Sequence, residues 1–496
     1  MNDLQNGSDI RGISITTTEH EANLTPDEVR KIGYGLVQWL EKDKGLSRKQ
    51  LRIALGKDSR LSGDGLKTAL QEVLSELGVT VIDVGLATTP AMFMATQFNK
   101  FACDASVMFT ASHLPYFYNG LKIFTVEGGA EHEDIEKILT YANTPIEAAK
   151  TPGDILQKDL ITPYAKDLVT KIRAGIGNVS EQPLSGLRII VDAGNGAGGF
   201  FTTHVLEPLG ADTTGSQFLE PDGTFPNHIP NPDNKEAIAS IQKAVKESDA
   251  DLGIIFDTDV DRAAVITSDG LPLNRNNLIA VLAYFVLQDE PGATIVTNSP
   301  TSSHLKAYIE SLGGKQYRYI SGYRNVINKG IELNKAGINT PLAIETSGHA
   351  AFRENYFLDD GAYVIAKLLI ALPQLMKEKR TLSDLIATLK QPAETHEVRF
   401  NIQADDVRQT GMSIIEDMAE FVEKTDGFSL DPENEEGIRV NVGEKLGSGW
   451  FLLRLSLHEP LLVLQVENDV EGKVAETLQC LTPFFKAYHT LDTSRL

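Results

Sequence analysis

Hydrophobic and polar positions follow two different periods along this chain. Seven short apolar runs, rich in Val, Ile and Leu and bounded by polar or glycine residues, predict buried β-strands. These runs begin at residues 51, 79, 104, 187, 251, 293 and 341. Between them, the stretches 63–78 and 236–247 place apolar residues three and four positions apart, which is typical of amphipathic helices. This alternation predicts α/β domains with largely parallel sheets and functional loops at the carboxyl ends of the strands.

A unit of strand, loop and helix occurs three times, near 51–90, 187–220 and 292–330, and each helix ends in a Leu-Gly pair typical of a C-cap. After about residue 393 the segments become shorter and alternate in polarity, which favours an α+β domain with an antiparallel sheet and an acidic PENEEG turn. At roughly 150 residues per domain, the 496 residues indicate about three domains, with two or four also compatible. The patterns divide them as 1–160, 161–272, 273–392 and 393–496.

Composition narrows the class of protein. Hydrophobic residues make up 42% and charged residues 23%, which excludes a disordered, collagenous or disulfide-scaffold protein. A net charge of −22 disfavours nucleic acid and anionic membranes as partners. Cys103 and Cys480 are too few for a disulfide framework, the first residues lack the plan of a signal peptide, and the most apolar helical stretch, 364–376, is too short to span a membrane. We expect a cytoplasmic protein.

The first stretch with chemical potential is TASHLPYFYNGLK, residues 110–122, which follows an apolar run. It places Ser112 on an exposed loop at the end of a strand, where a serine can act as a nucleophile if a base or a charge assists it. His113 and Lys122 are the local candidates for that assistance. Alternatively, Ser112 only caps a turn.

The second stretch is DLGIIFDTDVDR, residues 251–262. Asp257, Asp259 and Asp261 follow a buried strand and would repel one another unless a cation lay among them, and hard oxygen ligands favour Mg²⁺. Arg262 is suited to hold a phosphate beside that metal. The same pattern also resembles the nucleophile motif of dehalogenase-type phosphatases, in which Asp257 itself would accept the phosphoryl group.

Two further stretches are suited to bind a sugar phosphate. In residues 343–352, Glu345, Ser347 and His349 offer carboxylate, hydroxyl and imidazole groups for sugar hydroxyls. In residues 451–460, polar residues alternate with leucines and would share one face of a strand, where they could hold a phosphate: Arg454, Ser456 and His458. Each stretch is also compatible with an ordinary surface strand. The glycine-rich DAGNGAGG, 192–199, lacks the order of a dinucleotide fingerprint, and no P-loop is present.

In this order, from Asp9 to about Glu467, the motifs resemble those of the α-D-phosphohexomutase family, the phosphoglucomutase/phosphomannomutase group. TASHLPYFYNGLK is similar to its phosphoserine loop, DTDVDR to its metal loop, ETSGH to its sugar loop and RLSLHEP to its phosphate-binding loop. The resemblance implies three related α/β domains with mixed sheets and a C-terminal α+β domain similar to the TATA-box-binding fold, arranged around a central cleft.

The resemblance also implies an isomerase that interconverts hexose 1-phosphate and hexose 6-phosphate, of glucose or mannose, through a phosphoserine and a bisphosphorylated sugar. Ser112 would carry the phosphate and bind Mg²⁺ together with Asp257, Asp259 and Asp261. The groups around the transferring phosphoryl would be Arg11, Lys122, Arg262 and His349, the last as a proton carrier. The substrate-binding groups would be Glu345, Ser347, Arg324, Arg454, Ser456 and His458. A hexose 1,6-bisphosphate would act as activator, and the chain would work as a monomer or homodimer on a small sugar phosphate.

Three departures from the family pattern leave the preferred sugar open, and two of them are Ser8 where many relatives have Tyr and Thr346 where relatives often have Met, Gln or Glu. The family pattern R-x-S-G-T-E-P has Leu457 and His458 in its Gly-Thr places. The alternatives are a phosphoglucosamine mutase, a phosphatase that uses Asp257, and a sugar-phosphate sensor without turnover. Ser112 in a complete loop argues against the phosphatase, and the retained Asp residues and Lys122 argue against the sensor.

Overall fold

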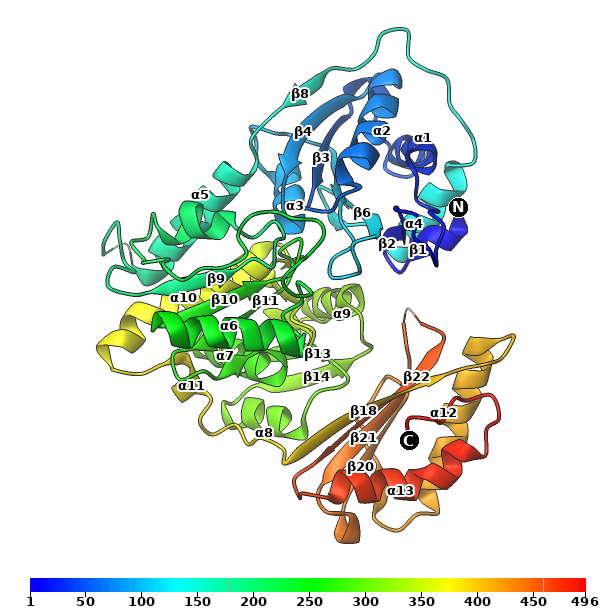
Figure 1. Cartoon of the computed structure of the whole chain (residues 1–496), viewed down its shortest axis with the longest axis vertical. Helices are drawn as coiled ribbons and strands as arrows, with labels where there is room; N and C mark the ends of the chain where they lie inside the picture. Colours follow the sequence, from blue (N-terminus) through cyan, green and yellow to red (C-terminus); the bar gives the residue numbers. More distant parts are fainter. Residues whose placement is uncertain (178, 458) are drawn as a thin grey trace. The chain divides into compact units, whose positions relative to one another are not determined.

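The computed structural model describes residues 1–177, 179–457 and 459–496, and it divides into two compact units. Unit 1 contains Met1–Arg275 and Ser347–Asp384, and unit 2 contains Asn276–Thr346 and Leu385–Leu496. Figure 1 traces the elements of each unit along the chain. Among the described residues, no helix is long and apolar enough to cross a membrane.

The first sheet of unit 1 is mixed. Its strands follow the order β1-β2-β6-β5-β3-β4-β8, with β7 paired to β6. The bounds are β1 (Gln5–Asn6), β2 (Asp9–Ile13), β3 (Arg52–Lys57), β4 (Thr80–Leu86), β5 (Ala105–Phe109), β6 (Tyr118–Thr125), β7 (Gly128–Gly129) and β8 (Ile155–Gln157). Strands β3, β4, β5 and β8 run parallel, whereas β1, β2, β6 and β7 pair antiparallel.

Helices cover both faces of this sheet, which explains why β5 is a continuous apolar run rather than an alternating one. The bounds are α1 (Pro26–Lys42), α2 (Gly63–Glu76), α3 (Thr89–Gln97) and α4 (His132–Tyr141), with short 3₁₀ turns η1 (Asn2–Leu4) and η2 (Arg48–Gln50). Residues of α1, α2 and α4 share one buried cluster with Val107 of β5. On the opposite face, the Ser106 hydroxyl donates to the carbonyl of Met92 in α3.

The second sheet of unit 1 has the order β12-β11-β10-β9. Its strands are β9 (Ile189–Asp192), β10 (Leu252–Phe256), β11 (Ala263–Thr267) and β12 (Pro272–Leu273), of which β9 and β10 are parallel. The remaining elements are α5 (Ile161–Ile176), η3 (Thr202–Leu206), α6 (Lys235–Ser248), α10 (Gly361–Lys377), α11 (Leu382–Leu385), η4 (Arg353–Asn355) and the hairpin β16 (Ala350–Phe352) with β17 (Leu358–Asp359). Ile241 and Val245 of α6 pack against Ile255 of β10.

Unit 2 contains a parallel trio and an antiparallel sheet. The parallel strands have the order β14-β13-β15 and are β13 (Thr294–Asn298), β14 (Lys315–Tyr319) and β15 (Leu342–Ile344), with helices α7 (Arg275–Asp289), α8 (Ser303–Ser311) and α9 (Tyr323–Lys335). The antiparallel sheet has the order β18-β22-β21-β20-β19. Its elements are β18 (Glu394–Asn401), α12 (Val407–Glu423), β19 (Phe428–Leu430), β20 (Ile438–Val442), η5 (Glu444–Leu446), β21 (Gly449–Leu455), β22 (Leu461–Asn468) and α13 (Lys473–Lys486).

Alternate residues of the antiparallel sheet, such as Val440 and Phe451, share a buried cluster with Met418 of α12 and Phe485 of α13. Both helices therefore cover one face, and Arg454 belongs to the opposite face. The sheet-rich C-terminal domain and the three α/β domains agree with the predicted fold class.

The predicted elements are found with small shifts, and two details differ. Helices α2 and α6 lie at the predicted stretches 63–78 and 236–247, and the C-terminal sheet is antiparallel. In the second repeat, the helix that precedes Leu209-Gly210 is short and is the π-helix η3. Strand β21 ends at Leu455, so Ser456 lies just after the strand and not within it as predicted.

Candidate active site

Ser112 lies directly after β5, on the loop that returns into β6. Its φ angle is +50°, a left-handed conformation that costs energy for a residue with a side chain. Its backbone N–H donates to Thr110 Oγ1 at 3.0 Å. The prediction of an exposed serine is wrong, because Ser112 is buried. The strained backbone is therefore held in place and fixes the direction of the Ser112 hydroxyl.

Arg60 holds the backbone of the loop between β5 and β6 through hydrogen bonds. Its guanidinium is buried and donates to four backbone carbonyls, those of Ser112, Leu114, Pro115 and Tyr118. Asp58 lies 3.5 Å from Arg60 Nε. Burial raises the pKa of Asp58 to about 6, although the Arg60 charge opposes the rise. Sequence reasoning missed this role, because the GKDSR stretch carries no sign that its arginine reaches a loop 52 residues later.

Three carboxylates follow the end of β10. Asp257, Asp259 and Asp261 are buried, and one oxygen from each lies within 4.8 Å of the others. Asp259 Oδ1 and Asp261 Oδ1 are buried without a hydrogen-bond partner among the described residues. Unpaired buried carboxylate oxygens are costly, and an all-oxygen set matches the preference of a hard divalent cation. These residues fit a Mg²⁺ site.

Two buried cations balance these carboxylates. Lys122 Nζ lies 3.2 Å from Asp259 Oδ2 and pairs with Asp261, while Arg262 Nε lies 3.1 Å from Asp257 Oδ2. Burial raises the pKa of Asp257 well above its usual value, and the neighbouring carboxylates add to the rise. Burial also opposes ionisation of Asp261, but the Lys122 charge and its cationic neighbours outweigh it and lower the pKa of that carboxyl.

The Ser112 hydroxyl lies between an acceptor and a cation. It donates to Asp257 Oδ2 at 3.1 Å and accepts from Arg262 Nη2 at 3.2 Å. His113 Nδ1 is 3.4 Å from the same hydroxyl. Burial and the charge of Arg262 lower the pKa of His113 to about 2, so its imidazole is neutral near pH 7.

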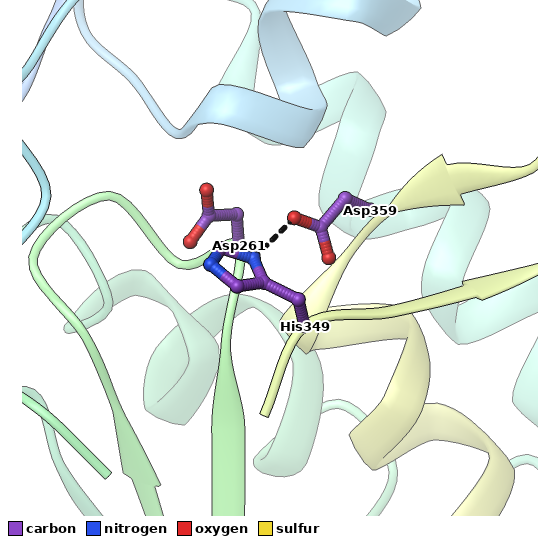
Figure 2. Close-up of side chains that lie close together, drawn as sticks. All are labelled: Asp261, His349 and Asp359. Carbon is purple, nitrogen blue, oxygen red and sulfur yellow. Dashed lines mark hydrogen bonds and ion pairs between the residues drawn. The ribbon is translucent and has the colours of Figure 1, made fainter. Parts of the chain in front are cut away.

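His349 joins this cluster through its neighbour Asp359. The His349 backbone pairs with that of Arg262, and its Nδ1 bonds the Asp359 carboxylate, which points toward the ring in Figure 2. Ligand atoms of Asp261, His349 and Asp359 lie within 4.8 Å of one another. Burial would lower the pKa of His349, but Asp359 and Asp261 outweigh it and raise that pKa. Asp359 was not predicted, since nothing in the sequence connects it to His349.

The other predicted residues are distributed over both units. Arg11, on β2, pairs with Asp9 at 2.9 Å, and the carbonyl of Ser347 accepts from Arg262 at 3.4 Å; both residues belong to unit 1. Glu345, which follows β15 in unit 2, is buried and accepts from the backbone N–H of Gly322 at 2.6 Å.

Three more predicted residues remain. In unit 2, Arg324 on α9 donates to Asn328 at 3.3 Å, and Arg454 lies 3.9 Å from Glu436. The Ser456 N–H donates to the Leu461 carbonyl at 2.9 Å. His458 lies outside the described residues. Unit 1 thus brings together the predicted nucleophile, metal ligands and cations, and unit 2 holds most of the predicted substrate contacts.

Family models match three consecutive parts of the chain. They describe the α/β/α domains I, II and III of phosphoglucomutase/phosphomannomutase and match residues 2–148, 163–270 and 274–392. The chain belongs to the phosphoglucomutase/phosphomannomutase family.

Known members of this family resemble the chain over most of its length. It is 34% identical to a phosphomannomutase/phosphoglucomutase of Pseudomonas syringae pv. tomato, over 87% of this chain and 86% of the relative. It is 31% identical to a phosphoglucomutase of Neisseria gonorrhoeae, over 95% and 94%. A solved structure of a family protein from Burkholderia thailandensis superposes with a TM-score of 0.79 and 27% identity, covering 98% of each chain. The chain is accordingly an isomerase of the phosphohexomutase type.

Proposed function

We propose that this enzyme interconverts hexose 1-phosphate and hexose 6-phosphate, with glucose or mannose as the sugar, through phosphorylation of Ser112. The observation that carries the proposal is the position of the Ser112 hydroxyl, 3.1 Å from Asp257 and 3.2 Å from Arg262 on a strained loop. Phosphoryl transfer needs mainly in-line placement and neutralisation of charge. A fixed hydroxyl beside a guanidinium and a carboxylate cluster supports both.

The residues around Ser112 divide these tasks. Asp257, Asp259, Asp261 and a phosphoserine oxygen would hold Mg²⁺, which when bound neutralises charge on the phosphoryl group. Arg262 donates to Ser112 and would follow the phosphoryl oxygens, with Lys122 and Arg11 as further cations. Asp359 accepts from His349 Nδ1, so His349 Nε2 is the nitrogen that would exchange a proton with a sugar hydroxyl.

The substrate contacts follow from the same proposal. Glu345 and Ser347 would bind sugar hydroxyls, and Arg324, Arg454, Ser456 and His458 would bind the phosphate that does not react. A hexose 1,6-bisphosphate would prime the enzyme, since it can phosphorylate a free Ser112. The working unit would have four domains, at 1–160, 161–272, 273–392 and 393–496. It would act in the cytoplasm as a monomer or homodimer without nucleic acid, in keeping with two free cysteines and a net charge of −22.

Asp257 is poorly suited to be the nucleophile of a phosphatase. Its carboxylate accepts from Ser112, from Arg262 Nε and from the Arg262 backbone N–H. These contacts favour Ser112 as the group that receives phosphate.

The test is to locate the phosphate and to follow its loss. We expect the purified enzyme to carry phosphate on Ser112 and Ser112→Ala to lose steady turnover. Ser106→Ala is a matched control, because Ser106 lies on the preceding strand and its hydroxyl bonds the Met92 carbonyl away from the site. Phosphate found on Asp257 as a hydroxylamine-labile acyl phosphate would overturn the proposal. Glucose, mannose, glucosamine and N-acetylglucosamine 1-phosphates assayed together identify the sugar and test the phosphoglucosamine alternative.

A further inference from the structure

Glu436 lies in the acidic PENEEG turn, immediately before β20, and no role in the reaction has been assigned to it. Its side chain is buried in unit 2, with 7% of the residue exposed. Its Oε2 accepts from the Ser321 backbone N–H at 3.2 Å, from Ser321 Oγ at 2.7 Å and from Ser299 Oγ. One carboxylate oxygen therefore accepts hydrogen bonds from both the loop that follows β13 and the loop that follows β14.

The second oxygen of Glu436 faces Arg454, the predicted phosphate-binding arginine. Glu436 Oε1 lies 3.9 Å from Arg454 Nη1. Among the described residues, this guanidinium makes one further polar contact, a weak one from Nη1 to the carbonyl of Leu455 at 3.4 Å. Because an arginine side chain has many rotamers, its charged neighbour contributes most to holding the Arg454 guanidinium in one place.

The backbone fixes this arrangement. Gly437 has a φ angle of +55°, and a Cβ at that position would lie 2.1 Å from the Leu453 carbonyl and 2.9 Å from Arg454 Cα. The chain directly after Glu436 thus lies against the backbone of Arg454, which only glycine permits. Arg439 braces the same strand: it is buried, donates to the carbonyls of Ser299 and Thr301, and stacks on Trp450 at 3.8 Å.

The contacts continue to Glu345, the predicted sugar-binding carboxylate. Gly322 follows Ser321, has a φ angle of +115° and donates its N–H to Glu345 Oε1 at 2.6 Å. Glu345, Gly322, Ser321, Glu436 and Arg454 therefore form one continuous set of contacts within unit 2. Both ends of this set are groups assigned to the substrate.

We propose that Glu436 is a positioning residue that sets the Arg454 guanidinium at a fixed distance from the sugar-binding carboxylate Glu345. This inference rests on the proposed function. A rigid spacing between the two groups suits a mutase, since the same hexose phosphate must be accepted in two orientations with its distal phosphate in one place. Glu436 itself touches no substrate and acts through Arg454 and the 321–322 turn.

The experiment measures binding of glucose 1-phosphate by calorimetry in a Ser112→Ala background, where no turnover interferes. Glu436→Gln retains an oxygen that accepts from Ser321 but loses the charge that faces Arg454, so we expect the dissociation constant to rise about tenfold. Glu435→Gln is the matched control on the same turn, because Glu435 is exposed and its carboxylate accepts from the Tyr317 hydroxyl, which is outside this set. Its dissociation constant should stay within about twofold of the parent value.

A double-mutant cycle separates positioning from general damage. In an Arg454→Ala background, Glu436→Gln should change the dissociation constant by less than about twofold, because its effect passes through Arg454. A further tenfold loss in that background would overturn the proposal, and so would unchanged or tighter binding in Glu436→Gln alone. Glu436→Asp, which keeps the charge, should bind more tightly than Glu436→Gln, and equal or weaker binding would contradict a role for the charge.

Failure of the proposed function gives a different result. If Arg454→Ala alone binds glucose 1-phosphate as well as the parent does, Arg454 is not a phosphate ligand and the proposed function is wrong at this loop. If Arg454→Ala weakens binding but Glu436→Gln does not, only the role of Glu436 is wrong. Melting temperatures of all variants verify that each one is folded.

Discussion

Ser112 illustrates how the surroundings of one side chain decide its chemistry. Its position after a buried strand is visible in the sequence, but its backbone strain and its contacts with Asp257 and Arg262 arise only on folding. Asp259 and Asp261 complete the site from the same loop, each with one buried oxygen that lacks a partner among the described residues. These unpaired oxygens are the strongest local sign of a cation site.

A chelator should therefore stop phosphoryl transfer, and Mg²⁺ should restore it. Because a ligand that binds only the folded state stabilises it, saturating Mg²⁺ at 100 times its dissociation constant should add about 2.7 kcal/mol to the free energy of unfolding. Thermal melts with and without Mg²⁺ measure this in the parent and in Asp259→Asn, which should show a smaller gain. Full activity in excess chelator would contradict the metal site.

A substitution of Glu345 tests the second prediction at the residue scale, which concerns binding of the sugar. We expect Glu345→Gln to lower kcat/KM by roughly tenfold or more for every accepted sugar phosphate, because a buried charged acceptor matched to hydroxyl donors is lost. Phosphate on Ser112 should be unaffected, since Glu345 belongs to unit 2 and Ser112 to unit 1. Steady-state kinetics and intact mass check the two statements, and an unchanged kcat/KM would place the sugar elsewhere.

At the scale of elements, the loop 221–232 is held to the end of β9 by one buried ion pair. His228 Nε2 lies 2.9 Å from Asp192 Oδ2, and Nδ1 lies 2.9 Å from the Ile229 carbonyl. Both ring nitrogens face acceptors, which favours the doubly protonated imidazolium. Asn231 belongs to the same loop, and its side chain accepts from Arg262 Nη1 at 3.2 Å, so the ion pair stabilises a segment that contacts the site.

The ion pair of His228 with Asp192 predicts that the free energy of unfolding depends on pH. Burial would lower the pKa of His228, but Asp192 outweighs it and raises that pKa above 6.5. A group whose pKa is higher in the folded than in the unfolded state adds its full stabilisation at pH values below its unfolded-state pKa. This stabilisation is lost as the pH rises through its folded-state pKa. His228→Asn should therefore destabilise the enzyme by about 2 kcal/mol near pH 6, and the deficit should shrink toward pH 9. Urea unfolding of both proteins across this range tests the sign, which a constant deficit would contradict.

At the scale of the whole molecule, the proposed chemistry belongs to unit 1 and most of the proposed substrate contacts belong to unit 2. Ser112, Lys122 and Arg262 lie in unit 1, whereas Glu345 and Arg454 lie in unit 2. Groups that only bind the distal part of a substrate affect its affinity more than the transfer step once the substrate is bound. Substitutions of substrate-binding residues in unit 2 should therefore change KM more than the rate of phosphoryl transfer, which depends on residues of unit 1.

Arg454→Ala should raise KM by about tenfold or more while the transfer between Ser112 and saturating glucose 1,6-bisphosphate slows by less than about threefold. Steady-state assays give KM, and single-turnover measurements of Ser112 rephosphorylation give the transfer rate. An equal loss in both would place Arg454 in the chemistry. An unchanged KM would remove residues 451–460 from the substrate site.

The sequence by itself determined the elements and the reactive residue types. Apolar runs located eleven strands, namely β3, β4, β5, β9, β10, β13, β15, β18, β20, β21 and β22. Polar residues at the ends of such runs pointed to Ser112, the three aspartates and Glu345, because strand ends and loops are local patterns. The ordered motifs also identified the family. The strand pattern predicted for Arg454, Ser456 and His458 failed in part, because β21 ends at Leu455.

Only the tertiary structure decided which of these residues meet. Arg60 bonds the carbonyl of Ser112 from 52 positions away, Ser112 bonds Asp257 across 145 positions, and Ser321 bonds Glu436 across 115. No sequence pattern assigned a role at the site to Arg60, Asp359 or Glu436. Their roles come from the packing of elements that are far apart in the sequence. Burial and hydrogen bonding over the whole chain determine this packing, whereas a sequence pattern describes only residues that are neighbours along the backbone.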